Sequence, residues 1–515
     1  MQQYEKEHLN LVQENAAECT VLLKTDGSFP LEKTGEIAAY GAGIRYTVMG
    51  GTGSGEVNTR FSYTIEQGLE KAGFAITTKK WLDEYDLVRK EAKKAFYKEL
   101  KKEAKEKHEN AIMYTMGKEM REPWHELSLD GNGDAAIYVL SRNSGEGSDR
   151  TALEGDVKLA KSEVRDILAL NKKYEKFMLV LNVGGVVDLS PVMEVRNILL
   201  LSQLGIDCGG VLADILLGKK NPSGKLTTTW ATWEDYSSEG TFGDWNDTNY
   251  NEGIYVGYRY FDTVGKRPLF PFGYGTSYTD FEIKTDDVIS KGDLFTVKVT
   301  VKNTGSFPGK EVVQTYVSLP DGKLGKAYQE LASFAKSSLL KPGESQQLEM
   351  SFGLSDLASY DEENSEYILE KGDYIIRVGN SSADTEVIAV AKLDETATTL
   401  KAKNVLGDPG FKDIRIERNG TEQISSDAKV VGNGAEQVPS DVKVISISAK
   451  DIPCGKVEYG VLGEIDERVK SFTDEELSYF AIGNFDVNTK GLSIIGNAAT
   501  HVAGAAGETT SQLGL

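Results

Sequence analysis

The feature that most constrains the fold is an alternation of apolar runs and helical patterns over the first 217 residues. The segments 135–140 and 177–181 are short apolar runs bounded by turn signals, which is typical of strands buried on both faces. A helical pattern at 155–170 lies between them. This alternation predicts a mostly parallel sheet that is covered by helices on both faces. Ligands of such sheets bind beyond the carboxyl ends of the strands.

Other patterns in residues 1–282 predict further elements of the same α/β domain. Helices are expected at 5–19, 64–72, 82–112, 190–201 and 209–217, and strands at 20–24, at 37–40 and directly before Trp230. Gly73 is a common stop signal for the helix that precedes it. The helix at 82–112 is rich in Lys and Glu at i,i+4 spacing, which indicates a solvated face rather than a binding site.

The pattern changes near residue 283, where short alternating strands begin. Phe295, Val297, Val299 and Val301 alternate with Thr and Lys, and turn residues separate this strand from the strands expected at 311–319, 346–352 and 373–378. This spacing predicts an all-β sandwich over 283–395. Residues 396–461 are polar with no sustained period and are expected to form a connector, and 462–485 look helical again.

Charge and cysteine usage exclude several classes of partner. The net charge of −21 argues against nucleic acid and against anionic membrane surfaces, so a neutral or cationic small ligand fits better. The polar N-terminus resembles no signal peptide and no apolar run is long enough to span a bilayer, which predicts a cytoplasmic protein. Cys19, Cys208 and Cys454 are far apart, which favours buried, unpaired thiols. No metal or organic cofactor is expected.

A candidate for acid–base chemistry is the loop at 141–150, which reads Ser-Arg-Asn-Ser-Gly-Glu-Gly-Ser-Asp-Arg and directly follows a predicted buried strand. Its carboxyl group, Glu146, is flanked by glycines and can be placed against a leaving oxygen. Arg142, Asp149 and Arg150 are charges that can shift its pKa in either direction, and they are also candidate substrate-binding residues. On chemistry alone, a proton donor and an exposed loop glutamate are equally good interpretations.

A second candidate loop covers 45–58 and is rich in glycine. It matches neither a phosphate loop, because no Lys stands at the required position, nor a dinucleotide fingerprint, because no helix follows at the required spacing. Two interpretations stay open, a substrate-lining loop and a conformationally demanding connection. In the first, Arg45, Gly51, Thr52 and Ser54 are the candidate substrate-binding residues.

Aromatic residues are dense at 251–262 and 268–278. Aromatic rings stack on sugar faces, but a domain-interface core is the more common role of such a cluster.

Four motifs in this order resemble the family 3 glycoside hydrolases, the β-glucosidases. They are Ser-Gly-Glu-Gly-Ser-Asp-Arg, Asn-Pro-Ser-Gly-Lys-Leu, Glu-Gly-Ile-Tyr-Val-Gly-Tyr-Arg-Tyr-Phe and Phe-Pro-Phe-Gly-Tyr-Gly-Thr-Ser-Tyr. The resemblance covers roughly residues 1–395. It implies an α/β sandwich domain, then a fibronectin-III-like domain, in the subgroup where a (β/α) barrel comes last.

The resemblance also implies which residues act. The acid/base of the family maps onto Glu146, whereas the nucleophile is an Asp in a Ser-Asp-Trp type motif, which these residues do not contain. Residues 462–515 look like the start of the barrel, including Gly-Ala-Ala-Gly-Glu-Thr-Thr at 504–510. A complete barrel takes about 250 residues, so an incomplete barrel is expected, and a second chain or self-association is a possible way to complete it.

The expected function is therefore retaining hydrolysis of terminal, non-reducing β-D-glucosyl residues, on a β-glucoside or a small oligosaccharide, with this chain supplying the acid/base and no nucleophile. The activity of the isolated chain stays an open question, since a retaining enzyme needs both carboxyl groups. The alternative is a non-catalytic carbohydrate-binding or protein-interaction module derived from such an enzyme.

Overall fold

The computed structural model describes residues 2–52, 55, 57, 59–115, 118, 120–144, 149–236, 244, 247–405, 407–416, 442–457 and 463–477. The chain forms two compact units, Met1–Gly455 and Lys456–Leu515.

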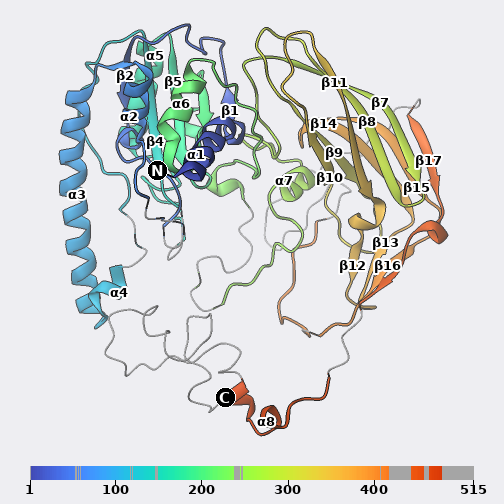
Figure 1. Ribbon diagram of the computed structural model, residues 1–515. Helices are drawn as coiled ribbons and strands as arrows, with labels where there is room; N and C mark the ends of the chain where they lie inside the picture. Colours follow the sequence, from blue (N-terminus) through green and yellow to red (C-terminus); the bar gives the residue numbers. More distant parts are fainter. Residues whose placement is uncertain are drawn as a thin grey trace. The chain divides into compact units, whose positions relative to one another are not determined.

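The first unit opens with a six-stranded sheet of order β1-β6-β5-β4-β2-β3 (Figure 1). Its strands are β1 (Val21–Lys24), β2 (Glu36–Tyr40), β3 (Ala75–Ile76), β4 (Ala135–Arg142), β5 (Phe177–Val183) and β6 (Ile198–Leu200). Neighbouring strands are parallel except that β1 pairs with β6 in the antiparallel sense. Every residue of β5 is buried, and so is every residue of β4 except Ser141, which confirms the predicted parallel sheet.

Helices α2 (Ile65–Ala72), α5 (Lys161–Lys173) and α6 (Cys208–Leu216) and the first turns of α3 (Lys79–Glu106) contribute side chains to the core around the sheet. The domain also contains α1 (Gln3–Asn15), α4 (Ala111–Thr115), α7 (Tyr258–Val264) and the 3-10 turns η1 (Ala16–Cys19), η2 (Ala42–Ile44), η4 (Ser190–Val192), η5 (Gly205–Asp207) and η6 (Trp233–Asp235). Gly73 ends α2 in the left-handed conformation, as predicted. Helices α2 and α6 pack so closely at Gly68 that a Cβ added there would lie 2.1 Å from the Gly209 backbone.

Two predicted elements of this domain are wrong. The helix expected at 190–201 is the turn η4 followed by strand β6. Its leucines imitate a helix, but the run is short and pairs between β1 and β5, and the buried Asn197 amide fixes it by donating to the Phe177 carbonyl at 2.9 Å. The strand expected before Trp230 is a single bridge to Phe270. The helix expected at 155–170 begins later, at Lys161.

The predicted β-sandwich is present. Its main strands are β7 (Phe281–Lys291), β8 (Leu294–Asn303), β9 (Val312–Ser318), β10 (Glu330–Lys336), β11 (Ser345–Gly353), β14 (Gly372–Ser381), β15 (Asp384–Leu393) and β17 (Lys443–Ile447). They form the sheets β10-β9-β14-β15-β17 and β11-β8-β7. The predicted inward residues of β8, Phe295, Val297, Val299 and Val301, are all fully buried in the sandwich core.

The segment expected to be a connector, 396–461, contributes to the sandwich. Strand β17 pairs in parallel with β15, and β16 (Ala397–Lys401) pairs with β13 (Glu366–Leu369), which also pairs with β12 (Ser359–Asp361). Two 3-10 turns, η7 (Leu354–Leu357) and η8 (Ala449–Asp451), complete the region. The prediction of a connector fails here because β16 and β17 are short and far apart in sequence, so neither shows a sustained alternation of apolar and polar residues.

The aromatic cluster lies at the junction of the two domains. Tyr258 of α7 stacks on Phe272 with ring centroids 4.6 Å apart and meets Tyr316 of β9 edge to face at 6.0 Å. Gln314 of β9 donates to the Gly273 carbonyl at 3.0 Å. The interpretation as an interface core is therefore confirmed.

Cysteine burial differs from the expectation. Cys208 is buried, but Cys19 and Cys454 are exposed. The expectation of three buried thiols is wrong for these two, because burial depends on tertiary packing that sparse cysteines do not reveal.

The second unit contributes helix α8 (Glu467–Lys470), which the Asp466 carboxylate caps by accepting the Arg468 N–H at 2.9 Å, and residues 474–477 are helical as well. A short strand, β18 (Gly455–Lys456), lies at the boundary between the units in sequence. The helical pattern expected at 462–485 and the barrel motif at 504–510 lie partly or wholly outside the described residues.

Candidate active site

A cavity of about 1090 Å³ opens at the carboxyl ends of strands β2 and β4. These strands are neighbours, yet the chain leaves them in opposite directions, since β2 leads through α2 to β3 at one edge and β4 leads through α5 to β5 on the other side. Connections that diverge in this way leave a crevice where ligands of α/β sheets bind. The lining comes from the loop after β2, one face of α3, residues 118 and 120–122, the loop after β4 and the turn before α6.

The loop after β4 is the one that carries Glu146, which itself lies outside the described residues together with Ser54. The loop is described up to Ser144 and again from Asp149, and two arginine side chains, Arg142 and Arg150, bond within these two described parts.

Arg142, the last residue of β4, is buried. Its guanidinium donates to both Glu163 oxygens, at 2.9 and 2.6 Å, and to the carbonyl of Asp156 at 2.9 Å. Burial by itself would lower the pKa of Arg142, but the Glu163 charge raises it by more. Arg142 therefore lines the cavity, but its guanidinium is bound by protein groups. Through Asp156 and Glu163 it connects the start of the loop with the end of the loop and with α5.

Arg150 supports the loop from the other side. It donates to the Asp156 carboxylate and, at 3.0 Å, to the Ser144 hydroxyl. The Asp156 carboxylate also accepts the Thr151 N–H at 2.6 Å. Burial alone would raise the pKa of Asp156, and these bonds together lower it. Asp149 lines the same cavity and is exposed, so it is free to face a ligand.

The Gly-rich loop is pinned where it leaves β2. Asn182, buried at the end of β5, accepts the Val48 N–H at 2.7 Å and donates to the Val48 and Ser202 carbonyls at 2.8 and 2.7 Å. The Ser141 hydroxyl donates to the Tyr46 carbonyl at 3.1 Å. These bonds fix the loop backbone relative to β4 and β5.

The two loops singled out from the sequence are also joined by a hydrogen bond of 2.9 Å from the Asn143 amide to the Thr52 hydroxyl. Thr52 lines the cavity, as predicted for a substrate-lining loop. Gly51 lies between two lining residues but is not one of the described residues that line the cavity.

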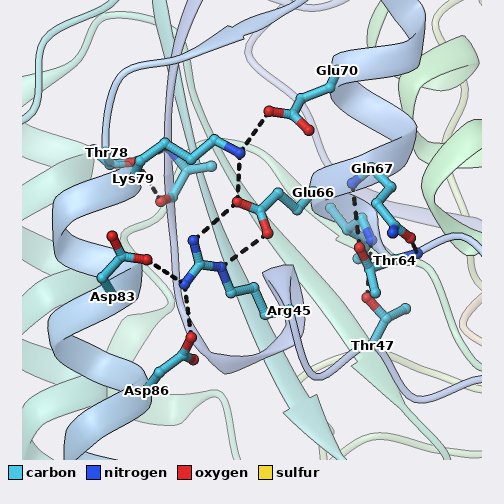
Figure 2. Close-up of polar contacts among 12 residues, drawn as sticks. Arg45, Thr47, Thr64, Glu66, Gln67, Glu70, Thr78, Lys79, Asp83 and Asp86 are labelled. Atoms are coloured by element: carbon cyan, nitrogen blue, oxygen red, sulfur yellow. Dashed lines mark hydrogen bonds and ion pairs between the residues drawn. The ribbon is translucent and has the colours of Figure 1, made fainter.

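Arg45 takes a different position from the one expected. Figure 2 shows its guanidinium surrounded by carboxylates of α2 and α3. It donates to Glu66 at 2.9 Å, to Asp83 at 2.8 Å and to Asp86 at 2.7 Å, and Lys79 joins the cluster through Glu66 at 2.7 Å. Arg45 is not among the described residues that line the cavity. It anchors the chain one residue before Tyr46, which does line it.

Glu122 is a cavity residue that sequence reasoning missed. Its Oε2 accepts from Arg89 of α3 at 2.6 Å, and its buried Oε1 has no hydrogen-bond partner. Burial and the nearby Glu163 charge raise the pKa of Glu122 to about 8, although Arg142 opposes them. Burial therefore favours the protonated form of this carboxyl group, whereas its ion pair with Arg89 favours the charged form. A lone Glu before Pro123 carries no local signal of this.

The arrangement gives a cavity with titratable carboxyl groups, hydroxyl and amide groups, and a proton-donor candidate on a loop held at both ends. Over the part of the chain that the structure describes, no group of three or more His, Cys, Asp or Glu side chains could hold a metal ion. No described helix is long and apolar enough to cross a membrane.

Comparisons with known proteins agree on the two domains. Residues 20–278 match the glycosyl hydrolase family 3 C-terminal domain, and residues 311–382 match a fibronectin type III-like domain. The chain is similar to beta-glucosidase A of Butyrivibrio fibrisolvens, at 35% identity over 434 residues, and to a beta-glucosidase of Ruminococcus albus, at 34% over 416 residues. These matches cover 74% and 76% of this chain but 51% and 41% of the relatives.

Solved structures give the same picture. Beta-glucosidase 3B from Thermotoga neapolitana, in complex with glucose, matches with a TM-score of 0.65 and 33% identity, over 76% of this chain and 55% of that one. A beta-glucosidase from Paenibacillus barengoltzii matches with the same TM-score at 32% identity, over 77% of this chain and 44% of that one. The chain thus spans about half the length of the relatives it matches.

Proposed function

Because the chain belongs to glycosyl hydrolase family 3, we propose that it carries the proton-donating half of the active site of a retaining β-glucosidase. The substrate is a β-glucoside or a small oligosaccharide with a terminal, non-reducing β-D-glucosyl residue, and Glu146 is the acid/base. The observation that carries the proposal is the set of hydrogen bonds made by Arg142 and Arg150. They fix the loop that contains Glu146 on both sides, at the carboxyl ends of β2 and β4, where the chain leaves the sheet in opposite directions.

Retaining hydrolysis takes two steps and two carboxyl groups about 5–5.5 Å apart. In the first step a carboxylate attacks the anomeric carbon while the glycosidic C–O bond breaks, and Glu146 gives its proton to the departing oxygen. In the second step water gives a proton to Glu146 and its oxygen attacks the anomeric carbon, which releases the nucleophile. We assign the nucleophile to a barrel segment with a Ser-Asp-Trp type motif, supplied by another stretch of chain or by a different second chain, because a second copy of these residues would lack the motif too.

The remaining candidate residues divide into two roles. Thr52, Ser54, Gly51 and Asp149 belong to the substrate-binding set, since their loops border the cavity or run into it. Arg45, Arg142 and Arg150 position these loops, because their guanidinium groups are engaged by protein carboxylates.

The test restores a family barrel segment to the chain, by fusion or by addition in trans, and measures hydrolysis of aryl β-glucosides. Glu146→Ala should lower kcat/KM by about 10²–10⁴ on substrates with poor leaving groups and much less on activated ones, because only the former need protonation. Azide should then restore turnover of activated substrates, since it replaces water as the attacking group without needing a base.

Glu154→Ala is the matched control, an exposed carboxylate nearby in sequence that pairs only loosely with Lys161, at 3.6 Å, and does not line the cavity. It should keep full activity. If Glu146→Ala hydrolyses poor substrates at the wild-type rate and azide has no effect, the acid/base assignment fails. If the completed protein binds glucosides without hydrolysing them, the non-catalytic module is the better description.

A further inference from the structure

The outer side of helix α3 carries a row of lysines. Residues 90–105 contain seven lysines and three glutamates, which is a local excess of positive charge in a chain whose net charge is −21. Five of the lysines are spaced by four, four, three and four residues, so they lie on one face of the helix within an arc of about 80°. These five residues, which we call the lysine stripe, are Lys90, Lys94, Lys98, Lys101 and Lys105.

The lysine stripe keeps its positive charge. All five lysines are exposed, and none of them forms an ion pair with a residue that the structure describes. Two of the three glutamates are bound elsewhere, because Glu99 pairs with Lys102 at 3.4 Å and Glu103 accepts a hydrogen bond from the Tyr114 hydroxyl at 2.8 Å. The third, Glu91, borders the stripe but pairs with none of its lysines.

This arrangement is unfavourable for α3 by itself. Like charges three or four residues apart repel each other along a helix, and the stripe consists of such pairs from one end to the other. Glutamates at alternate positions of the stripe would replace this repulsion by attraction. A face that destabilises the isolated helix is explained if an acidic surface covers it.

The stripe lies away from the cavity. The side chains of α3 that line the cavity point in a direction roughly 130° around the helix axis from the stripe; they are Arg89, Lys93, Phe96 and Leu100. The stripe extends for about 22 Å along the axis. Figure 1 shows that the later turns of α3 continue past the end of the sheet. The stripe is therefore a straight, narrow surface that is separate from the candidate active site.

Two exposed apolar side chains accompany the lysines. Leu87 lies three residues before Lys90, and Tyr97 lies between Lys94 and Lys101 on the same side of the helix. A partner that covers the stripe would also bury these two side chains, and the burial of apolar surface would add to the attraction between charges.

We propose that the lysine stripe is the docking site for an acidic helix of a protein partner. A helix with carboxylates at the same spacing repeats its charges by the same rise, about 6 Å for four residues, so the charges stay opposite each other along the whole stripe. Pairs of glutamate and lysine between neighbouring helices set the choice and orientation of a partner. The inference is independent of the proposed function, and it revises the interpretation of α3 as a merely solvated face.

Other polyanions suit the stripe less well. An anionic membrane or a nucleic-acid duplex is broad, so it would also face the rest of a chain whose net charge of −21 repels it. A single helix is about 10–12 Å wide and contacts the stripe alone. The stripe also contains no arginine, the residue that best matches the geometry of phosphate.

The test measures the binding of a fluorescent helical peptide to the full chain by anisotropy. The first peptide carries five glutamates at the spacing of the stripe, and the second has the same composition with the glutamates distributed around the helix. The first should bind saturably at low salt and more weakly as salt rises, because the charges are exposed. The second should bind about tenfold more weakly, since it brings fewer carboxylates to the stripe at once.

Variants of the stripe locate the binding. K94Q/K98Q/K101Q should raise the Kd of the first peptide by about tenfold, whereas K94R/K98R/K101R should keep it close to that of the wild type, because the charges remain. The matched control, K33Q/K172Q/K341Q, removes the same charge from exposed lysines outside α3 and should leave Kd unchanged. All of these side chains are exposed, so the variants retain the fold.

The inference is overturned if the two peptides bind equally, or if the control variant weakens binding as much as K94Q/K98Q/K101Q. It is also overturned if that stripe variant loses binding to vesicles of phosphatidylserine and phosphatidylcholine, or to duplex DNA, while its affinity for the first peptide stays unchanged. Sedimentation velocity covers the remaining occupant: if the wild type self-associates and K94Q/K98Q/K101Q is monomeric, the stripe binds a second copy of this chain and the proposal of a separate acidic helix is wrong.

Discussion

Two arginines near the candidate active site, Arg142 and Arg45, each hold a loop in place through ion pairs, but they differ in how far they are buried. Arg142 is buried against one carboxylate, Glu163, and two backbone carbonyls. Arg45 is partly exposed and bound by three carboxylates, of which Asp83 is 70% exposed. Both arginines hold a loop that borders the cavity. We therefore expect burial, rather than the number of partners, to set how much stability is lost when either arginine is removed.

The difference follows from solvation. A charge removed from water must find its whole compensation inside the protein, so loss of one buried partner leaves the other with a large desolvation cost. A partly exposed charge keeps water as an alternative partner, and salt screens what remains.

The largest expected effect is the loss of Arg142. Arg142→Met should lower the free energy of unfolding by about 3–5 kcal/mol, because it leaves the Glu163 carboxylate unpaired in a buried site. Urea denaturation measures this. The double variant R142M/E163Q should recover most of the loss, since the glutamine is neutral and its carbonyl can still accept the Ala160 N–H that Glu163 accepts at 2.7 Å. A double variant no more stable than Arg142→Met would contradict the explanation.

An intermediate effect on the free energy of unfolding is expected at a second buried pair, His125 and Asp166, whose closest atoms are 3.6 Å apart. Asp166 lies on α5, the helix that also carries Glu163, the partner of Arg142. Burial lowers the pKa of His125 to about 4, with help from Arg165, and burial raises the pKa of Asp166 to about 6. Between pH 4 and 6.5 the unfolded histidine binds a proton that the folded one does not, so its contribution to stability rises with pH. Asp166 does the opposite between pH 3.8 and 6.

The two contributions therefore oppose each other in the wild type. Asp166→Asn removes the contribution of Asp166, which decreases as pH rises. The free energy of unfolding of the variant, relative to that of the wild type, should therefore rise between pH 4 and 6 by at most about 1.4 kcal/mol per pH unit. His125→Gln should give the opposite slope. Urea midpoints at several pH values measure both. Parallel curves for all three proteins would show that the pair does not titrate on folding.

The strands of the two domains were predictable where burial imposes a period. The inward residues of β8 alternate cleanly, and β4 and β5 are continuous apolar runs. Strand β10 was missed because its residues are half-buried or exposed along most of its length, which leaves no alternation to detect. For β6 the sequence predicts a helix instead, because a run of three apolar residues such as Ile198–Leu200 is compatible with either structure until its neighbours are known.

The candidate site was predictable only as loops. Both loops follow strands that the sequence identifies, so their place at the edge of the sheet could be expected. The roles of their arginines could not, because the partners are distant in sequence: Glu163 is 21 residues from Arg142, and Asp86 is 41 residues from Arg45. From the sequence alone, an arginine that pairs with a carboxylate of the protein cannot be distinguished from an arginine that binds a ligand.

The smallest effect is expected at Arg45, and it sharpens the comparison most directly. Arg45→Met should lower the free energy of unfolding by only about 1 kcal/mol at low ionic strength, although it removes three ion pairs. Salt at 1 M should abolish most of this difference, because screening acts on partly exposed charges, whereas the cost of Arg142→Met should persist.

The Arg45 difference should also fade in acid. Burial would raise the pKa of Glu66, but its bonds with Arg45 and Lys79 lower it by more. A carboxyl with a lowered pKa stabilises the fold above its unfolded pKa, and this stability is lost as pH falls through the folded value. The difference between wild type and Arg45→Met should therefore be full at neutral pH and shrink below about pH 4. A difference independent of both salt and acid would mean that Arg45 acts through packing, and the contrast with Arg142 would then lie in shape rather than in solvation.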